Sequence, residues 1–499
     1  MRESFPAVRS RTAPLSAALV GALAVAGSYA VAGTDPAFLV APVHSLVVDL
    51  TPAPVLAFSI LVLGDVGDLL GFLLALAVAV AALGAVALAG FALGRRYGTA
   101  AALGTVYFGT WGLTALLTGA PWTALGAAVP ATLGVWLFAV RPLDRLGARV
   151  GPIEESRRQV VRLLGVAGFS GFAFAVGRRM PFRTPRLSVI SAEEQATIRR
   201  RLRSARGRSL ELSGIDGLVT PVGEFYEVDV DTINPSVDVG DWTLDVSGAV
   251  ETERSLTYDD LTARSPEHRF TTLRCVGEPL NGEKMDTALW TGVPVDDVLA
   301  AAGVAESATH VRLRAVDGYY ETFPLAAIRG GLLAYGMNGY LLPRSHGYPV
   351  RALVPGHWGE VNVKWLTGID VLEREAESYW EKRGWHGTGP VKTVAKLHAV
   401  ERIDDGRIRV GGHAYAGTRG IGTVQVSTDG GGTWNDATLS APLPDADVWR
   451  QWAYAYRPPA GEHEVVVRAV DGDGALQSRY RSRAFPAGAS GWVSKRIQP

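Results

Sequence analysis

The stretch NGYLLPRSHGYPVRALVPG, residues 338–356, decides how the second half of this chain folds. It ends in RALVPG, one of several short runs in which apolar and polar residues alternate between Gly and Pro, as strands do. Gly347 and Pro349 restrict the backbone between His346 and Arg351, so we expect the imidazole and the guanidinium to be held in a fixed relation. Taken alone, the stretch also fits an ordinary turn.

Two further stretches place polar residues in apolar or tightly turned surroundings: FYEVD (225–229) and VNVKWL (361–366). Arg351 and Lys364 would suit a phosphate, because arginine offers a bidentate fork and lysine a point charge. The plain alternatives are a strand edge with a solvated arginine and a surface lysine packed beside Trp365. Each stretch alone is weak evidence for a functional site, and only their combination favours one.

The surrounding sequence indicates two soluble domains after an arginine-rich linker, 181–210. WTLDVSGAV and HVRLRAVDG read as strands and VPVDDVLAAAGV as a helix, so we expect a mixed α+β domain over residues 211–388. From 389 to 499, strand candidates such as HEVVVRAVD recur between turn residues. This pattern predicts an all-β, immunoglobulin-like sandwich of about seven strands.

Residues 1–180 have the pattern of an α-helical membrane domain. LLGFLLALAVAVAALGAVALAGFA (69–92) is longer than the roughly 20 residues that cross a hydrocarbon core. Arg9 and Arg11 ahead of the first apolar run would also fit a signal peptide, but the apolar segments that follow favour an uncleaved anchor. The predicted spans are 15–33, 69–92, 100–117, 124–140 and 160–176.

Residues 38–64 hold two apolar halves, each too short to cross, separated by Asp49, Pro52 and Pro54. A hairpin that dips into the membrane fits this pattern, and His44 and Asp49 would be either functional or interfacial residues there. Arginines lie before the first span, after the second and after the fourth, so the positive-inside rule directs the last span outward. We therefore expect a multi-pass protein of the cell membrane with an extracytoplasmic catalytic domain.

Cys275, in TTLRCVGEPL (271–280), is the only cysteine among 499 residues. A disulfide within the chain is excluded, which leaves an inert buried thiol, an intermolecular bridge, a nucleophile or a metal ligand. The inert thiol is the commonest of these. The formal net charge is zero and no Cys/His spacing of a zinc module occurs, so nothing indicates a nucleic-acid partner.

Together, TLRCVG (272–277), the segment 335–371 and GIGTVQVSTDGGGTW (420–434) resemble the sulfite-oxidase family of molybdopterin enzymes in order and approximate spacing. The resemblance runs from about residue 215 to the C-terminus. It implies one molybdenum held by the dithiolene of one molybdopterin and by one protein thiolate, which Cys275 matches. A soft thiolate suits such a redox-active metal. The all-β domain resembles the family's dimerisation domain, which implies a homodimer.

Carried over residue by residue, the resemblance makes Cys275 the metal ligand and aligns Trp385 with a tyrosine that sulfite oxidases keep beside the metal. These two are the candidate catalytic residues. The cofactor would carry the redox chemistry while an oxygen atom passes between the metal and a small substrate. The residues expected around the pterin and its phosphate are Phe225, Tyr226, Asp317, His346, Arg351, Asn362, Val363 and Lys364.

The pocket also departs from that of sulfite oxidases. Val228 and Val230 stand where those enzymes place Arg and His, and EPLNG follows Cys275 where they have two arginines. A dianion needs donors and positive charge to replace its water, so we expect sulfite to be a poor substrate and an S-oxide or other small oxo compound a better one. FYE and RCV resemble bacterial methionine sulfoxide reductases, although those lack the sandwich and usually have Asn where His346 stands.

Two functional hypotheses follow. The first is a membrane-anchored molybdopterin oxidoreductase with an unidentified electron donor or acceptor. The second is a cofactor-free surface protein whose sandwich binds a partner. Cys275 occurs together with His346, Arg351 and Lys364, and this favours the enzyme, because a scaffold has no need of all four. Arg157 and Arg158 resemble an internal twin-arginine export signal, or else are ordinary positive-inside charges.

Overall fold

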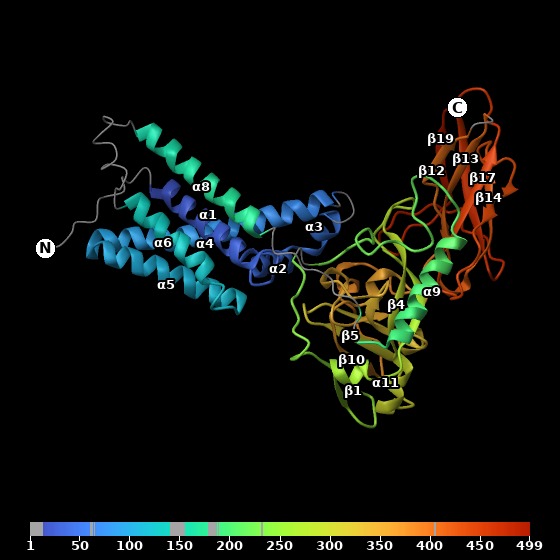
Figure 1. The fold of residues 1–499 in the computed structure, drawn as a ribbon, viewed down its shortest axis with the longest axis horizontal. Coiled ribbons are helices and arrows are strands. Elements are labelled where there is room, and N and C mark those ends of the chain that lie inside the picture. Colours follow the sequence, from blue (N-terminus) through green and yellow to red (C-terminus); the bar gives the residue numbers. More distant parts are fainter. Residues whose placement is uncertain are drawn as a thin grey trace. The chain divides into compact units, whose positions relative to one another are not determined.

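Contacts within the chain define two compact units in this computed structural model, Met1–Arg183 with Asp229–Ser236, and Thr184–Val228 with Val237–Pro499. Figure 1 shows a helical unit in blue and teal and a β-rich unit in green to red. The structure describes residues 13–59, 63, 65–139, 155–177, 187, 189–230, 233–403 and 406–499.

The first unit is built from apolar helices, among which α1 contacts α4, α6 and α8, and α4 contacts α5 (Figure 1). Glycines allow these helices to approach closely. A Cβ on Gly21 of α1 would lie 2.3 Å from the Val80 carbonyl oxygen of α4, and one on Gly27 would lie 2.2 Å from the Gly126 carbonyl oxygen of α6. The helices are α1 (Ala13–Ala32), α2 (Val40–Leu50), α3 (Ala53–Phe58), α4 (Asp65–Tyr97), α5 (Thr99–Thr118), α6 (Leu125–Ala139) and α8 (Glu155–Gly177).

Each of the five predicted spans coincides with a helix, and three of them are long and apolar enough to cross a membrane: Ala13–Ala32, Leu69–Tyr97 and Thr99–Thr118. The apolar parts of α6 and α8 are shorter, Leu125–Leu137 and Leu163–Gly177. Large apolar side chains of α4 and α5 remain exposed, which is compatible with contact to lipid. The helical unit is therefore compatible with membrane anchoring.

The predicted hairpin, residues 38–64, contains α2 and α3, separated at Thr51 and Pro52 because proline opens a new helix rather than continuing the old one. His44 of α2 is buried, and a Cβ on Gly71 of α4 would lie 3.4 Å from its Nε2. Asp49 is exposed. Residues 60–62 and 64 lie outside the described residues, and the dip into the membrane stays a prediction.

Two features of the chain were not predicted. Residues Asp229–Ser236 belong by contact to the helical unit, where Ile233 packs against the helical core. The expected linker contains α9 (Ala192–Arg208), which begins with a capping box: Ser191 Oγ accepts the Glu194 N–H, and Glu194 accepts the Ser191 N–H. The sequence S-A-E-E carries this signal, but the run of arginines conceals it.

The α+β part holds two sheets. One has the strand order β2-β1-β10-β5-β6, with β1 and β10 parallel, and the other has the order β3-β4-β7-β8, with β9 also paired to β7. Their strands are β1 (Thr243–Gly248), β2 (Arg254–Thr257), β3 (Glu267–Arg274), β4 (Met285–Pro294), β5 (His310–Ala315), β6 (Tyr320–Pro324), β7 (Leu332–Met337), β8 (Tyr340–Leu341), β9 (Arg351–Leu353) and β10 (Leu366–Leu372). The α-helices are α10 (Tyr258–Thr262), α11 (Val295–Ala302) and α12 (Leu325–Ile328), and short 3₁₀ turns are η2 (Arg344–His346), η3 (Gly359–Val361) and η4 (Glu381–Arg383).

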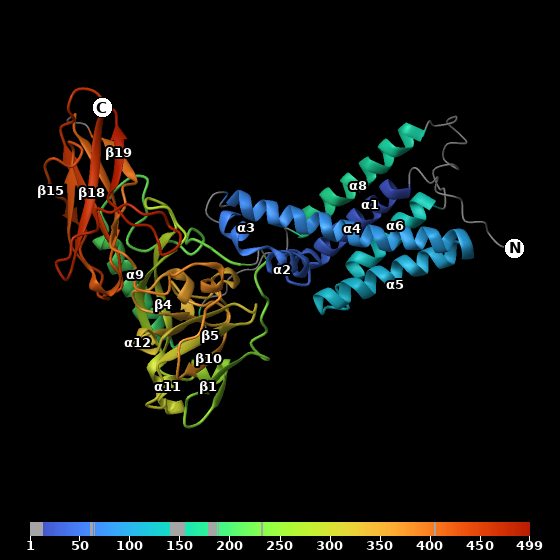
Figure 2. The ribbon, with the colours of Figure 1, turned by 180° about the vertical axis from the view of Figure 1, so that it is seen from behind.

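The C-terminal part consists of two antiparallel sheets, β11-β13-β17-β16 with β12 on β13, and β15-β14-β18-β19, and β14 contacts β13, β16 and β17 of the other sheet. Figure 2 shows β15, β18 and β19 in one sheet. Within the described residues there are nine strands, more than predicted because three are only two residues long. They are β11 (Val394–Ala395), β12 (Ala399–Arg402), β13 (Ile408–Tyr415), β14 (Ile421–Ser427), β15 (Asn435–Asp436), β16 (Thr438–Leu439), β17 (Arg450–Tyr456), β18 (His463–Asp471) and β19 (Val493–Ile497). The immunoglobulin-like assignment stays a prediction.

Candidate functional site

Cys275 is the first residue after β3, because the register of β3 with β4 ends at the pair Arg274 and Met285. Its N–H donates to the Lys284 carbonyl at 3.0 Å, and its side chain is half-buried. Burial, with a smaller contribution from the nearby Glu278, raises the pKa of the thiol to about 11. The free thiol is therefore neutral, and a bound metal would have to displace its proton to gain a thiolate.

Phe225 and Tyr226 are held by Asp286 of β4. The Tyr226 N–H donates to Asp286 Oδ2 at 2.7 Å, and the Thr220 hydroxyl donates to Oδ1 at 2.9 Å. Phe225 is buried and meets the Trp290 ring edge-on, with centroids 5.6 Å apart. Burial raises the pKa of Asp286 to about 6, although both hydrogen bonds act against this shift. The carboxylate thus fixes the backbone that presents Tyr226.

Tyr226 is close to both Cys275 and Arg351. A Cβ on Gly359 would lie 2.7 Å from the Tyr226 hydroxyl and 3.2 Å from the Arg274 carbonyl oxygen, so this glycine permits the close approach. Burial and then the charge of Cys275 raise the pKa of Tyr226 well above its usual value, while Arg351 lowers it. Cys275 and Arg351 are therefore both close to the phenol.

His346 closes the 3₁₀ turn η2 and is only 2% exposed. Its Nε2 lies 3.3 Å from the Val222 carbonyl oxygen and 3.7 Å from Glu227 Oε1. Burial, followed by the charges of Lys364 and Arg351, lowers its pKa to about 3, so the ring is neutral at physiological pH. A neutral ring that donates from Nε2 keeps Nδ1 as an acceptor.

Arg351 begins β9 and is buried. Its guanidinium donates from Nη1 to the His346 carbonyl at 3.2 Å and from Nη2 to the Asn362 carbonyl at 2.9 Å, and it stacks 5.2 Å above the Trp290 ring. Gly347, with φ of +105°, makes the turn possible, because a Cβ there would lie 3.1 Å from the Arg351 Cβ. The guanidinium is thus bonded to the backbone of His346 and not to its imidazole, and the fixed relation expected between the two side chains stays a prediction.

The segment Asn362 to Lys364 runs beside this turn. Asn362 accepts the Val354 N–H at 2.8 Å and donates to the Trp358 carbonyl at 2.8 Å, while the Val363 carbonyl accepts the Ala352 N–H. Lys364 Nζ donates to the Ser345 carbonyl at 2.8 Å. We refer to His346, Arg351 and residues 362–364, with Phe225 and Tyr226, as the cationic cradle.

Trp385 follows the 3₁₀ turn η4 and packs edge-on against Phe485, with centroids 5.3 Å apart. Two residues later, a Cβ on Gly387 would lie 2.7 Å from Val276 Cγ2 and 2.2 Å from Glu360 Oε1. The chain after Trp385 therefore passes beside the residue that follows Cys275. The Trp385 Nε1 is buried and has no hydrogen-bond partner among the described residues.

Asp317 lies in the turn between β5 and β6, where it accepts the Tyr319 N–H at 3.0 Å. The Tyr319 hydroxyl donates to Glu321 Oε1 at 2.7 Å and contacts the Glu360 carbonyl at 3.1 Å. Burial raises the pKa of Glu321 to about 8 and that of Glu360 well above its usual value, so both acids bind protons readily. These contacts connect Asp317 to Glu360 through Tyr319. They do not place Asp317 in the cationic cradle.

Sequence reasoning missed a buried ion cluster beside Cys275. Glu278 accepts from Arg274 Nε at 2.9 Å and from Lys396 Nζ at 2.8 Å, with the three side chains 0 to 1% exposed. The stretch EPLNG (278–282) was interpreted only through the two arginines that sulfite oxidases have there and that it lacks. Lys396 comes from the C-terminal domain, 118 positions away, and no local pattern indicates such a partner.

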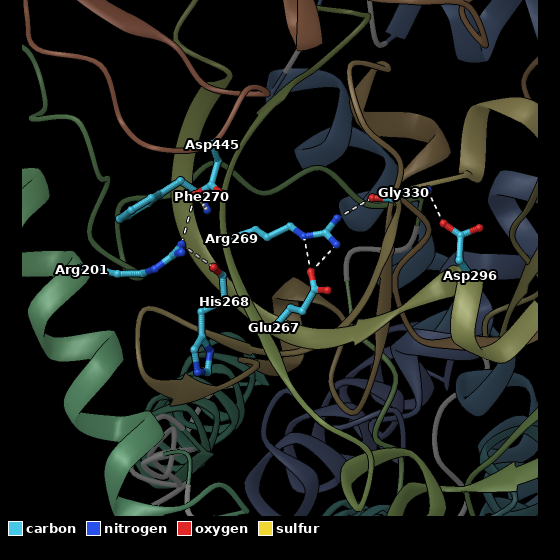
Figure 3. Close-up of polar contacts among 8 residues, drawn as sticks. All are labelled: Arg201, Glu267, His268, Arg269, Phe270, Asp296, Gly330 and Asp445. Carbon is cyan, nitrogen blue, oxygen red and sulfur yellow. Dashed lines mark hydrogen bonds and ion pairs between the residues drawn. The ribbon is translucent and has the colours of Figure 1, made fainter.

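Further contacts hold β3, the strand that leads to Cys275 (Figure 3). Arg201 of α9 donates to the His268 carbonyl and to Asp445 Oδ2, and the Phe270 N–H donates to the same Asp445 oxygen at 2.9 Å. Arg269 of the same strand donates to the Gly330 carbonyl. Helix α9 and a loop of the C-terminal domain therefore both hold β3.

The chemistry of these groups fits a molybdenum bound through an organic ligand. Among the described residues no group of three or more His, Cys, Asp or Glu is arranged to hold a metal, so a metal here has to bring most of its ligands with it. Cys275 supplies a soft ligand, and the cationic cradle supplies charge for a phosphate. Cys275 would hold the metal and the cradle the pterin.

Comparison with known proteins assigns both soluble parts. Residues 231–380 match the model of the oxidoreductase molybdopterin binding domain, and residues 390–485 match that of the Mo-co oxidoreductase dimerisation domain. Mitochondrial sulfite oxidase of Macaca fascicularis is 33% identical over 291 residues, which cover 48% of this chain and 53% of that protein. Sulfite oxidase of Gallus gallus is 32% identical, with 48% and 63% covered.

The chain spans about half the length of the mammalian sulfite oxidases it matches. Among solved structures, the sulfane dehydrogenase SoxCD from Paracoccus pantotrophus has a TM-score of 0.50 at 22% identity, covering 57% of this chain and 82% of that one, which shows a shared fold. The expected molybdenum cofactor is confirmed by the domain match. Residues 231–380 are therefore assigned as an oxidoreductase molybdopterin binding domain, and residues 390–485 as a Mo-co oxidoreductase dimerisation domain.

Proposed function

We propose that this chain is a membrane-anchored molybdopterin oxidoreductase that passes an oxygen atom to or from a small substrate outside the cytoplasmic membrane. The observation that carries the proposal is that Tyr226 is close to both Cys275 and Arg351, with its hydroxyl and the Arg274 carbonyl oxygen both beside Gly359. This arrangement joins a soft metal ligand to a phosphate-binding cradle. When bound, the molybdenum cofactor supplies the two-electron chemistry.

The chain's own residues would bind and orient the cofactor. Cys275 would give up its proton and ligate the metal. Arg351 and Lys364 offset the phosphate charge, and their existing bonds to backbone carbonyls hold them in place beforehand. The neutral His346 contributes hydrogen bonding without adding charge. Trp385 forms an apolar wall near the substrate.

The charges near Cys275 support an uncharged substrate better than a dianion. Arg274 and Lys396 both pair with the single anion Glu278 and are 0 to 1% exposed, so neither is available to replace the water of an entering dianion. Val228 is an exposed apolar residue at 44%. Glu360 adds an acid beside Val276. We therefore propose an S-oxide as substrate, whose reduction consumes two electrons and two protons and releases water.

One preparation tests substrate and class together. Molybdenum per chain would be measured first, and then steady-state sulfite oxidation and methionine sulfoxide reduction with artificial electron carriers. We expect about one molybdenum per chain and preferential S-oxide turnover. Efficient saturable sulfite oxidation would contradict the substrate proposal, and a folded chain without molybdenum would favour the cofactor-free surface protein instead.

The Mo-co dimerisation domain suggests a homodimer, which we propose forms through residues 389–499. The chain mass is 53.0 kDa, so light scattering of the detergent-solubilised protein should give twice this value after subtraction of the detergent. A monomeric mass at micromolar concentration would contradict the dimer. The electron partner stays unidentified, and its redox chemistry must match a two-electron reaction.

Localisation is likewise a proposal. Arg157 and Arg158 lie near the start of α8, where an export signal would need them. Changing both to Lys keeps the charge, so a purely electrostatic role predicts no effect, whereas a twin-arginine role predicts a catalytic domain retained in the cytoplasm. Protease accessibility of the C-terminal half in spheroplasts distinguishes the two outcomes.

A further inference from the structure

The connection between β3 and β4, residues 275–284, carries Cys275 at its first position and is too long for a tight turn. The side chain of Glu278 closes this connection. The Cys275 N–H donates to the Lys284 carbonyl, and the Lys284 N–H donates in turn to Glu278 Oε2 at 3.0 Å. Glu278 therefore supplies the acceptor that backbone pairing would supply in a shorter hairpin.

Glu278 is itself fixed by two buried cations, Arg274 and Lys396. Lys396 Nζ also donates to the Gly282 carbonyl at 2.8 Å, and Arg274 Nη1 donates to the Lys392 carbonyl at 2.9 Å. Buried ions contribute less to stability than well-packed apolar side chains of the same size, because their desolvation is costly. A cluster of three beside the metal ligand thus indicates a role other than stability.

The same stretch of the C-terminal domain, residues 392–398, holds the tip of the loop. Asn281 Nδ2 donates to the Leu397 carbonyl at 3.1 Å, and the Leu397 N–H donates back to Asn281 Oδ1 at 2.8 Å. His398 Nε2 lies 3.2 Å from the Asn281 carbonyl oxygen. Segment 392–398 therefore contacts the loop at its base, its middle and its tip.

We propose that Glu278 is a positioning residue for Cys275 and that Lys396, with segment 392–398, makes the C-terminal domain part of the molybdenum site as well as a dimerisation module. The inference rests on the proposed function of Cys275 as the metal ligand. Its physical basis is that Glu278 is only three positions from Cys275 in the chain, so movement of Glu278 redirects the sulfur. Groups that orient a metal ligand affect metal binding nearly as strongly as the ligand itself.

Two substitutions keep side-chain size and change only the cluster: Lys396→Met removes a cation, and Glu278→Gln removes the anion but keeps an acceptor. In the full-length protein, each should lower molybdenum per folded chain, or speed its release, by about ten- to a hundredfold. Each should also shift the visible absorption that arises from the thiolate–molybdenum bond. Wild-type occupancy with an unshifted band in both variants would overturn the proposal.

The double variant Glu278→Gln/Lys396→Met separates positioning from stability. It leaves one buried cation without its anionic partner, Arg274, where Glu278→Gln alone leaves two, Arg274 and Lys396, so its melting temperature should recover above that of Glu278→Gln. Positioning predicts that occupancy and absorption stay altered. If both recover together with the melting temperature, the cluster is merely structural and the proposal is wrong.

Arg314→Met is the matched control, because it breaks the Arg314–Asp370 ion pair between β5 and β10 and touches neither loop nor segment. It should leave occupancy unchanged. Hydrogen exchange of amides 275–284 supplies a readout that needs no cofactor: exchange should accelerate in Lys396→Met and not in Arg314→Met. Equal protection of amides 275–284 in the two variants would overturn the proposed role of Glu278 and Lys396. If the wild-type chain lacks molybdenum but Lys396→Met still accelerates this exchange, only the proposed function is contradicted.

Discussion

The two sides of the site are built in different ways. In the cationic cradle, His346, Arg351 and Lys364 lie within 19 positions of one another, and their side chains bond mainly to nearby backbone carbonyls. Around Cys275, by contrast, the key partners Glu278 and Lys396 are 118 positions apart and are both ions. His346, Arg351 and Lys364 form a local motif within the cradle, whereas the surroundings of Cys275 are assembled from two domains.

The difference predicts how each side fails. A carbonyl left without its donor costs roughly 1–3 kcal/mol and disturbs its own turn. A buried ion left without its partner costs more, about 3–5 kcal/mol, and disturbs the contact between domains. Substitutions of the cradle residues should therefore disturb only their own turn, whereas substitutions beside Cys275 should also disturb the contact between the two domains.

The largest effect is expected at the metal ligand itself. Cys275→Ser replaces the soft sulfur with a hard oxygen, and because the half-buried side chain makes few contacts, the fold should persist. We expect roughly a hundredfold or greater loss of oxygen-transfer activity, measured alongside circular dichroism of the same sample. Full activity in the serine variant would make Cys275 an inert thiol.

Arg351→Met tests the cradle. The substitution removes the donors to the His346 and Asn362 carbonyls and the stacking on Trp290, so it should destabilise the β-rich unit by about 2–4 kcal/mol. Pterin content should also fall. Chemical denaturation and fluorescent pterin assay give the two values, with Arg329→Met, which breaks an exposed ion pair, as a control expected to cost less than about 1 kcal/mol.

His346 tests the cradle through pH. Its folded pKa is about 3, while an unfolded histidine titrates near 6.5, so between these values the unfolded chain binds a proton that the folded chain does not. This contribution to stability is present above about pH 6.5 and is lost as pH falls, by up to roughly 1.4 kcal/mol per pH unit. In His346→Gln, the stability deficit relative to wild type should shrink between pH 7 and pH 5. A deficit that is constant in urea titrations across that range would contradict the assignment.

The smallest effect is expected for Trp385→Phe. The indole N–H has no hydrogen-bond partner among the described residues, and phenylalanine keeps the aromatic contact to Phe485, so the loss of stability should stay below about 1.5 kcal/mol. We expect kcat to change by less than about threefold, since an apolar wall is retained. A much larger loss of kcat with unchanged stability would instead assign the N–H to the substrate.

The sequence by itself determined those features that depend on neighbours in the chain. Apolar runs predicted the positions of α1, α4 and α5, because a run of apolar residues long enough to cross the membrane can be recognised without knowing which distant segments it contacts. Gly347 and Pro349 likewise predicted the turn between His346 and Arg351. The motif around Cys275 led to the correct cofactor, which the domain match confirms.

Only the tertiary structure decided what depends on distant segments. It placed α9 against β3, gave residues 229–236 to the helical unit, and brought Lys396 to Glu278. Each of these contacts joins residues that no periodicity relates, and each is selected by burial: an ion or an apolar side chain enters the interior only where the folded chain supplies its partner. For that reason the cations of the cradle could be predicted from two neighbouring stretches of sequence, 338–356 and 361–366, and the surroundings of Cys275 could not.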